Sequence, residues 1–368
     1  MTSKKQGQLI EREVLSTPRL NLGIFMPSVS HHPNISSYKP DPDDWTFAKN
    51  LEIAREAEKV GFDFLFPVSR WRTIGGEIDF HGKSLETMTW AAGLLASTSR
   101  IDIYSTVHVP VFNPVVAAKM GATLDHISGG RWGINIVSGW NKSEFEMMGV
   151  EMLEHSQRYK RSTDFIKILK GLWMSAPGTF DFESRHYRVK QGYSMPQPQR
   201  KPHPPIVNAG TSSEAREMVA QHCDWSFVCP MTYEQAREMV EDIKTRAKKN
   251  NRNVKVVTMA QPVWDLDPGK ARAEKDKVIE HMDTEALSRW AEGAGLESES
   301  FNQQTTETFC FGSGAMPLVG TPAEVAEQIA EFRNVGMDGV LMSYMDFLRD
   351  TKRFGSEILP LLKKMNAA

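Results

Sequence analysis

Eight short apolar segments alternate with segments of helical periodicity along almost the whole chain, and this alternation limits the folds that the chain can adopt. Alternating strands and helices are typical of a parallel sheet covered by helices. Eight such units predict an α/β protein with the architecture of the (β/α)8 TIM barrel, and a doubly wound open sheet is the alternative. The predicted strands are residues 20–27, 62–68, 101–107, 132–137, 206–209, 225–229, 254–262 and 339–344.

Helix boundary signals support this alternation. Gly61 follows the first periodic segment, where a glycine in the left-handed conformation commonly ends a helix. Pro114 lies in the first turn of the helix predicted after the third strand. Thr321 and Glu324 have the spacing of a capping box and predict the start of the helix before the last strand.

Two stretches interrupt the alternation and predict insertions. Residues 175–205 contain six prolines and the pattern of a β-hairpin. Residues 270–319 begin as a charged helical segment and end in the polar, glycine-containing stretch 298–319, for which we expect a mobile lid. The expected organisation is an N-terminal arm at 1–19 and a single TIM-barrel domain at 20–368 that carries both insertions.

Charge and composition exclude several classes of protein. The chain has 44 Lys and Arg against 46 Asp and Glu, so it lacks the basic excess that drives nucleic-acid binding. It has no apolar run of 18 residues and no apolar segment near the N-terminus, so we expect neither a membrane span nor a signal peptide. Three cysteines cannot form a disulfide framework, which favours a reducing, cytoplasmic location.

The chemistry of such barrels lies on the loops that follow the carboxyl ends of the strands. These loops carry no zinc motif, nucleophile elbow or phosphate-binding glycine loop, and we expect no metal site. They carry hydroxyls, an amide and tryptophan, which suit an organic cofactor that performs the difficult step itself. His31 and His32 are expected in a solvated loop, whereas His108, at the predicted barrel mouth, is a candidate pocket residue.

The segment Gly210-Thr211-Ser212-Ser213 lies between the fifth barrel strand and the next helix. Hydroxyls and backbone N–H groups at a helix N-terminus are well suited to bind a phosphate group. The alternative is an ordinary helix cap, since serine is a preferred N-cap residue. Composition does not decide between the two.

The fourth strand continues as Asn135-Ile-Val-Ser-Gly-Trp140, followed by Glu144 and by Arg158-Tyr159. In this combination the chain resembles the bacterial luciferase-like flavin monooxygenases, in the branch of the pyrimidine and dimethylsulfone monooxygenases, over about residues 20–362. The resemblance implies the barrel, reduced FMN supplied by a separate NAD(P)H-dependent flavin reductase, and O2 as co-substrate. It also implies a homodimer or homotetramer.

The resemblance assigns roles to individual positions. Thr106, Asn135 and Trp140 match the oxygen side and the wall of the reaction cavity, and His108 joins them as a candidate for its position alone. Each position has a structural alternative, such as rim packing for Trp140 or a charge in the first turn of a helix for Glu144. The positions that match FMN contacts are Ser69, Arg70, Asn135, Glu144, Arg158, Tyr159 and Ser212.

We therefore expect an FMNH2-dependent monooxygenase that cleaves a C–N or C–S bond in a small substrate, such as an N-heterocycle, an amide, a sulfone or a sulfonate. Residues 28–44 and 76–85 depart from the pattern of the pyrimidine enzymes, so the substrate stays open. Two alternatives remain from other classes. One is a deazaflavin-dependent hydride-transfer oxidoreductase, and the other is a flavin-binding subunit without catalytic activity.

Overall fold

Eight parallel strands close into a barrel in the computed structural model, which describes residues 19–293 and 303–368. The barrel closes where β8 pairs with β9, and this confirms the predicted (β/α)8 TIM-barrel fold. The eight strands coincide with the eight apolar segments. They are β1 (Asn21–Met26), β2 (Phe64–Pro67), β3 (Asp102–His108), β4 (Trp132–Val137), β7 (Ile206–Asn208), β8 (Trp225–Phe227), β9 (Lys255–Trp264) and β11 (Gly339–Met342).

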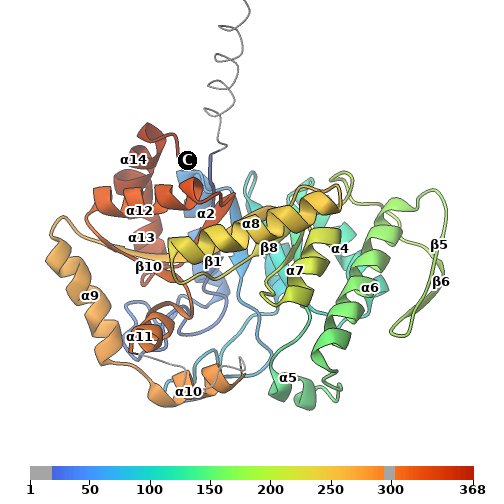
Figure 1. The fold of residues 1–368 in the computed structure, drawn as a ribbon, viewed down its shortest axis with the longest axis horizontal. Helices are drawn as coiled ribbons and strands as arrows, with labels where there is room; N and C mark the ends of the chain where they lie inside the picture. Colours follow the sequence, from blue (N-terminus) through green and yellow to red (C-terminus); the bar gives the residue numbers. More distant parts are fainter. Residues whose placement is uncertain (1–18, 294–302) are drawn as a thin grey trace, which may run out of the picture.

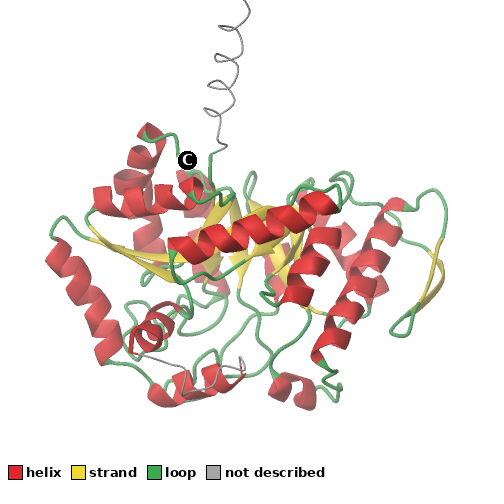
Figure 2. Ribbon diagram, in the orientation of Figure 1, coloured by secondary structure: helices red, strands yellow, loops and turns green. Residues whose placement is uncertain are grey.

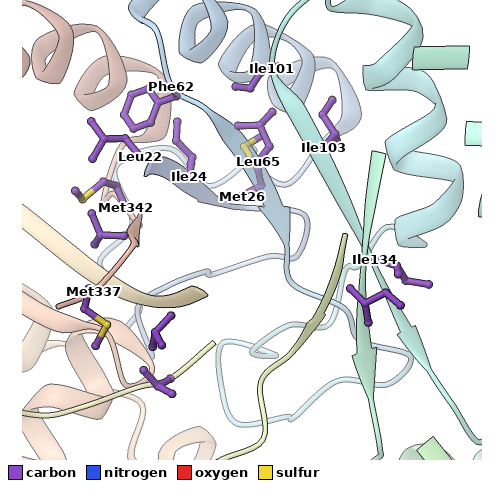
Figure 3. Packing of buried hydrophobic residues seen from close by; sticks show 14 of the residues in the cluster. Leu22, Ile24, Met26, Phe62, Leu65, Ile101, Ile103, Ile134, Met337 and Met342 are labelled. Carbon is purple, nitrogen blue, oxygen red and sulfur yellow. The ribbon is translucent and has the colours of Figure 1, made fainter. Parts of the chain in front are cut away.

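Side chains alternate between the two faces of each barrel strand. In β1, Leu22, Ile24 and Met26 face outward and pack in the large core between the sheet and the helices (Figure 3). Phe25, which lies between them in the sequence, packs with the smaller cluster that fills the barrel interior. An apolar run therefore suits these strands, because both of their faces are buried.

Helices surround the strands on the outside of the barrel (Figures 1 and 2). No helix among residues 19–293 and 303–368 combines the length and the apolar character that crossing a membrane requires. The surrounding helices are α2 (Phe47–Val60), α3 (Thr87–Ser97), α4 (Pro114–Ser128), α6 (His155–Met174), α7 (Ser213–His222), α8 (Tyr233–Lys249), α12 (Pro322–Asn334), and α13 (Phe347–Arg353), which continues through a π-helical turn into α14 (Leu359–Lys364).

The boundary signals in the sequence act as expected. Gly61 ends α2 with φ = 104°, a left-handed conformation that a residue with a Cβ rarely adopts. Asn113 caps α4, which begins at Pro114. Thr321 and Glu324 form a complete capping box at the start of α12. These local signals set the register in which the helices meet the barrel.

The segment 175–205 forms the predicted hairpin. Its strands, β5 (Phe180–Glu183) and β6 (Arg188–Gly192), are antiparallel and form a separate two-stranded sheet. Figure 1 shows this hairpin extending beside α6, away from the barrel. It therefore takes no part in the barrel mouth.

The second insertion contains α9 (Pro268–Glu280), α10 (Thr284–Gly293), α11 (Gln303–Gly312) and β10 (Met316–Gly320). Residues 303–319 are largely regular structure, α11 and β10, and not the irregular polar stretch that the sequence suggested; the role of a mobile lid stays a prediction, and residues 298–302 lie outside the described residues. Cys310 and Phe311 are fully buried in α11, and β10 pairs with the last residues of β9. Hydrogen bonds between Cys310 and Ile35 stabilise α11. Because these two residues are far apart in the sequence, the polarity of the segment itself does not predict the contact.

Candidate functional site

A cavity of about 550 Å³ opens at the carboxyl ends of the barrel strands. Its walls come from the ends of β2, β3, β4, β7 and β8 and from α6, α7 and α10. Figure 1 shows α5 (Lys142–Met147), α10 and α11 at this end of the molecule, opposite the C-terminus. All sequence-predicted site residues except Glu144 line it, namely Ser69, Arg70, Thr106, His108, Asn135, Trp140, Arg158, Tyr159 and Ser212.

Thr106 and Asn135 form a polar pair on adjacent strands at the bottom of the cavity. They are register partners on β3 and β4, and the Asn135 amide donates a hydrogen bond to Thr106 Oγ1 at 3.2 Å. Both residues are at least 95% buried, and Asn135 Oδ1 is buried without a partner. A buried acceptor without a partner costs about 1–3 kcal/mol, so this oxygen is a candidate acceptor for a hydrogen bond from a ligand.

Thr87, at the start of α3, fixes the backbone of Thr106. Its hydroxyl donates to the Thr106 carbonyl at 2.7 Å and accepts from the Thr106 N–H at 3.1 Å. Because both contacts are buried, they hold this part of β3 in one position relative to α3. The polar pair is therefore supported from outside the barrel.

Arg70 forms one side wall of the cavity. Its guanidinium lies over the ring of Trp140, with 4.9 Å between Cζ and the ring centroid, and Nη1 donates to the Ser69 carbonyl at 2.8 Å. Burial lowers the pKa of Arg70, with an opposing effect from the charge of Glu144. Its Nε is buried without a partner, so the side chain keeps a donor for a ligand.

Glu144 lies behind this wall. It is 98% buried in the first turn of α5 and accepts a hydrogen bond at 2.9 Å from the backbone N–H of Trp71. The Trp71 indole in turn donates to His108 Nδ1 at 3.1 Å. Glu144 thus fixes the loop after β2, and its role as a direct cofactor contact stays a prediction.

A second polar corner lies where α6 meets the N-terminus of α7. Arg158 donates from Nη1 to the Gly139 carbonyl, and its Nε is buried without a partner. Ser212 caps α7 by accepting a hydrogen bond from the Ala215 N–H at 3.2 Å. Tyr159 lies beside this cap, and burial raises the pKa of its hydroxyl. The corner combines a guanidinium, two hydroxyls and a helix N-terminus, a donor set suited to a phosphate group.

The turn between β7 and α7 requires a glycine. A Cβ on Gly210 would lie 2.6 Å from Ala215 Cβ and 2.7 Å from the Tyr159 hydroxyl oxygen. Asn208 holds the turn by donating to the Ile136 carbonyl at 2.6 Å and accepting from the Gly210 N–H at 2.9 Å. The tight turn brings the α7 N-terminus against the cavity.

The expectation of a solvated His31–His32 loop is wrong for His32. His32 is 98% buried, and its ring contacts Phe25 and lies near His81. Burial lowers the pKa of His32 well below its ordinary value. The residues that the structure describes contain no group of three metal-ligating side chains suited to a metal ion.

Residues that were not assigned from the sequence include Trp71, which contacts His108 behind the cavity wall, and Phe227, Cys229 and Trp290, which line the cavity. Strand alternation could have identified Phe227 and Cys229, because both lie on the inner face of β8 and of the residues that continue it. Trp290 lies on α10, and only the tertiary placement of the second insertion brings it to the cavity.

Residues 20–339 match the family described as luciferase-like monooxygenase. The FMNH2-dependent dimethylsulfone monooxygenase of Pseudomonas putida is 32% identical to this chain, over 87% of this chain and 89% of that protein. The pyrimidine monooxygenase RutA of Cronobacter turicensis is also 32% identical, over 94% and 93% of the two chains. Among solved structures, riboflavin lyase superimposes with a TM-score of 0.84 at 22% identity, covering 95% of this chain and 93% of that one, a likeness of fold.

Proposed function

The chain belongs to the luciferase-like monooxygenase family, and from this membership we propose that it is the oxygenase component of a two-component, FMNH2-dependent monooxygenase. A separate NAD(P)H-dependent flavin reductase supplies the reduced FMN, and O2 is the co-substrate. The reaction cleaves a C–N or C–S bond in a small molecule. The observation that carries the proposal is the buried Thr106–Asn135 pair, which places an unused acceptor at the bottom of the mouth cavity.

The residues around the cavity fit FMN. The volume of about 550 Å³ lies within the range of cofactor sites. Three buried polar atoms along the cavity lack partners among residues 19–293 and 303–368, namely Asn135 Oδ1, Arg70 Nε and Arg158 Nε. Two are donors and the third is an acceptor, so the cavity offers both kinds of hydrogen-bonding group to a ligand that carries a polar ring and a phosphate.

Each group has a role in holding the cofactor. Arg158, Ser212 and the α7 N-terminus would bind the phosphate, and Tyr159 would lie along the ribityl chain. Ser69, Arg70 and Asn135 would hold the ring system, with Asn135 able to donate and to accept a hydrogen bond. When bound, reduced FMN supplies the electrons that activate O2.

The apolar part of the wall excludes water from the reacting atoms. Trp140 lies under the Arg70 guanidinium, and Trp290 contacts Phe309 with 4.7 Å between the ring centroids. Thr106 presents a hydroxyl that can hydrogen-bond an oxygen species without adding a charge. A dry and uncharged environment favours transfer of oxygen to the substrate over release of hydrogen peroxide.

We further propose a cytoplasmic homodimer or homotetramer. The thiols of Cys223, Cys229 and Cys310 are all free, which fits a reducing compartment. Light scattering coupled to size-exclusion chromatography measures the assembly. A monomer at micromolar concentration would contradict it.

An isotope experiment tests the proposed function. The purified chain is mixed with FMN, NADH, a flavin reductase and 18O2, and with dimethyl sulfone, uracil, an alkanesulfonate or another N-heterocycle. We expect 18O in a product whose formation requires both FMN and the reductase. Turnover with a reduced deazaflavin and no O2 would favour hydride transfer instead. Tight FMN binding without any O2-dependent product would favour a non-catalytic subunit.

A further inference from the structure

His108 occupies the inner face of β3, two residues after Thr106, and lines the mouth cavity. Its Nδ1 accepts a hydrogen bond at 3.1 Å from the indole N–H of Trp71. Its Nε2 makes no hydrogen bond with the residues that the structure describes, and it is not among their buried unpartnered atoms. Nε2 therefore faces the cavity.

The contact with Trp71 decides the protonation state of the imidazole. An indole N–H is a donor only, so the nitrogen that faces it must carry a lone pair. With Nδ1 unprotonated, a neutral imidazole carries its proton on Nε2. Protonating Nδ1 would place two N–H groups against each other and break the contact. Consequently, His108 presents an N–H donor to the cavity and no lone pair.

The surroundings of His108 keep this state. Burial, and next to it the positive charge of Arg70, lower the pKa of His108 to about 3. Trp71 is held on both sides, because its backbone N–H donates to the buried Glu144 carboxylate and its ring lies 6.3 Å from that of Phe112. The backbone of Trp71 is therefore fixed by Glu144, and its ring packs against Phe112, so the indole is held where it donates to His108 Nδ1.

We propose that Trp71 is a positioning residue that fixes His108 in its Nε2–H tautomer, and that His108 donates this hydrogen bond to an acceptor oxygen of the substrate. The inference rests on the proposed function. The oxygen is a carbonyl or a sulfonyl oxygen, since a neutral donor suits an uncharged acceptor. His108 transfers no proton and is not a general base, because its cavity-facing nitrogen has no lone pair to receive one.

Nuclear magnetic resonance of the substrate-free protein tests the tautomer. The protein is labelled with 15N-histidine. The signals that are present in the wild-type spectrum and absent from that of His108→Gln are assigned to His108. We expect an unprotonated Nδ1 and a protonated Nε2 at every pH from 5 to 8. In Trp71→Phe, which removes the indole donor, we expect a mixture of tautomers. An Nδ1–H tautomer in the wild-type protein, or titration of His108 within this range, would overturn the assignment.

Kinetics with a matched pair of variants tests the donor. The glutamine amide nitrogen of His108→Gln reaches the position of Nε2, whereas His108→Asn keeps only a group near Nδ1. With dimethyl sulfone and uracil as probes, we expect KM to rise roughly ten-fold or more in His108→Asn and much less in His108→Gln. FMN affinity should stay within about three-fold of wild type in both.

Equal KM values in the two variants and the wild type would overturn the donor role of His108. If only one probe is turned over, the same comparison shows whether the oxygen is a sulfonyl or a carbonyl oxygen. If wild type turns over neither probe, the comparison uses the alkanesulfonate or N-heterocycle that gives an 18O-labelled product, and the substrate assignment fails with the proposed substrate classes if none does. The resonance experiment still decides the tautomer in that case, so the two failures are distinguishable.

Discussion

Asn135 lies where an aliphatic side chain would pack inside the barrel at no electrostatic cost. Its amide donates to Thr106, but its carbonyl oxygen has no partner, so the folded chain carries a desolvation cost of about 1–3 kcal/mol there. The cost is recovered when a ligand with a donor binds. This makes Asn135 the side chain whose removal should affect the chemistry more than the fold.

The first prediction concerns this pair. In Asn135→Ala and Thr106→Val, we expect product formed per NADH to fall at least five-fold and peroxide release to rise, because the polar contacts to the reacting groups are lost. Thr106→Ser keeps the hydroxyl and serves as the control. Coupling is measured as product and peroxide per NADH in the presence of the reductase. Normal coupling in both variants would show that Thr106 and Asn135 do not contact the reacting oxygen.

At the next scale, the α7 N-terminus combines a structural and a binding role. Ser212 caps the helix, as the alternative interpretation of the sequence had it, and the same hydroxyl lies on the cavity wall. A cap alone therefore does not exclude a phosphate contact. The two roles can be separated by a residue that caps well but repels an anion.

The second prediction uses that separation. Aspartate is a good N-cap, so Ser212→Asp should leave the stability within about 0.5 kcal/mol of wild type but weaken FMN binding more than ten-fold through charge repulsion. Combining Ser212→Ala with Arg158→Ala should weaken it further. The control is Thr232→Asp, a change at the N-cap of α8 outside the cavity lining. A flavin titration that gave unchanged affinity in Ser212→Asp would reject the phosphate assignment.

The third prediction concerns helices α10 and α11 at the mouth of the cavity, which we call the α10–α11 cover. Trp290 lines the cavity and contacts Phe309 on α11. Trp290→Ala should admit water, so that peroxide release rises several-fold while FMN binding changes little. Leu266→Ala, at a side chain that is 87% exposed just ahead of the second insertion, is the control outside the cavity lining. Equal coupling in both variants would show that the cover does not keep the cavity dry.

The elements also show how far sequence reasoning reaches. All eight barrel strands were predicted, because a strand buried on both faces appears as a continuous apolar run such as LNLGIFMP. Helix α11 was not predicted, and α5 entered only through the alternative that placed Glu144 in the first turn of a helix. Their buried faces, Glu144 and Phe145 in one and Cys310 and Phe311 in the other, contact distant parts of the chain, and no local pattern encodes those contacts.

The features of the site also divide into those that the sequence predicts and those that it does not. The strand-end positions of Thr106, His108 and Asn135 follow from counting along apolar runs, and the structure brings all three to one cavity. The contact between Trp71 and His108 does not follow from any spacing, since 37 residues separate them. It depends on the path of a loop that Glu144 holds from a third element.

For the whole molecule, buried histidines predict how stability depends on pH. Burial lowers the pKa of His32 and His81 well below the ordinary value, of His222 to about 4, and of His108 to about 3. As the pH falls below about 6.5, each of these histidines binds a proton in the unfolded chain but not in the folded one. Folding stability should therefore fall with decreasing pH, down to the folded pKa of each group.

Buried carboxyls whose pKa is raised oppose this trend, namely those of Asp44, Asp102 and Asp350. Burial raises the pKa of Asp44 to about 6, although Lys39 beside it acts in the other direction. Between about pH 6 and pH 4, the folded state keeps a proton on Asp44 that the unfolded chain has released. Asp44 therefore adds stability as the pH falls in that window, which offsets part of the loss that comes from the histidines.

The fourth prediction follows from this balance. The free energy of unfolding in urea should decrease from pH 7 to pH 5, with a slope that approaches about 1.4 kcal/mol per pH unit below pH 6.5 for each histidine that stays neutral. His81→Asn should flatten the dependence, because asparagine does not titrate and tolerates the left-handed backbone at this position, where φ = 59°. Asp44→Asn should steepen it. A free energy of unfolding that is constant from pH 7 to pH 5 would mean that the folded protein protonates these histidines.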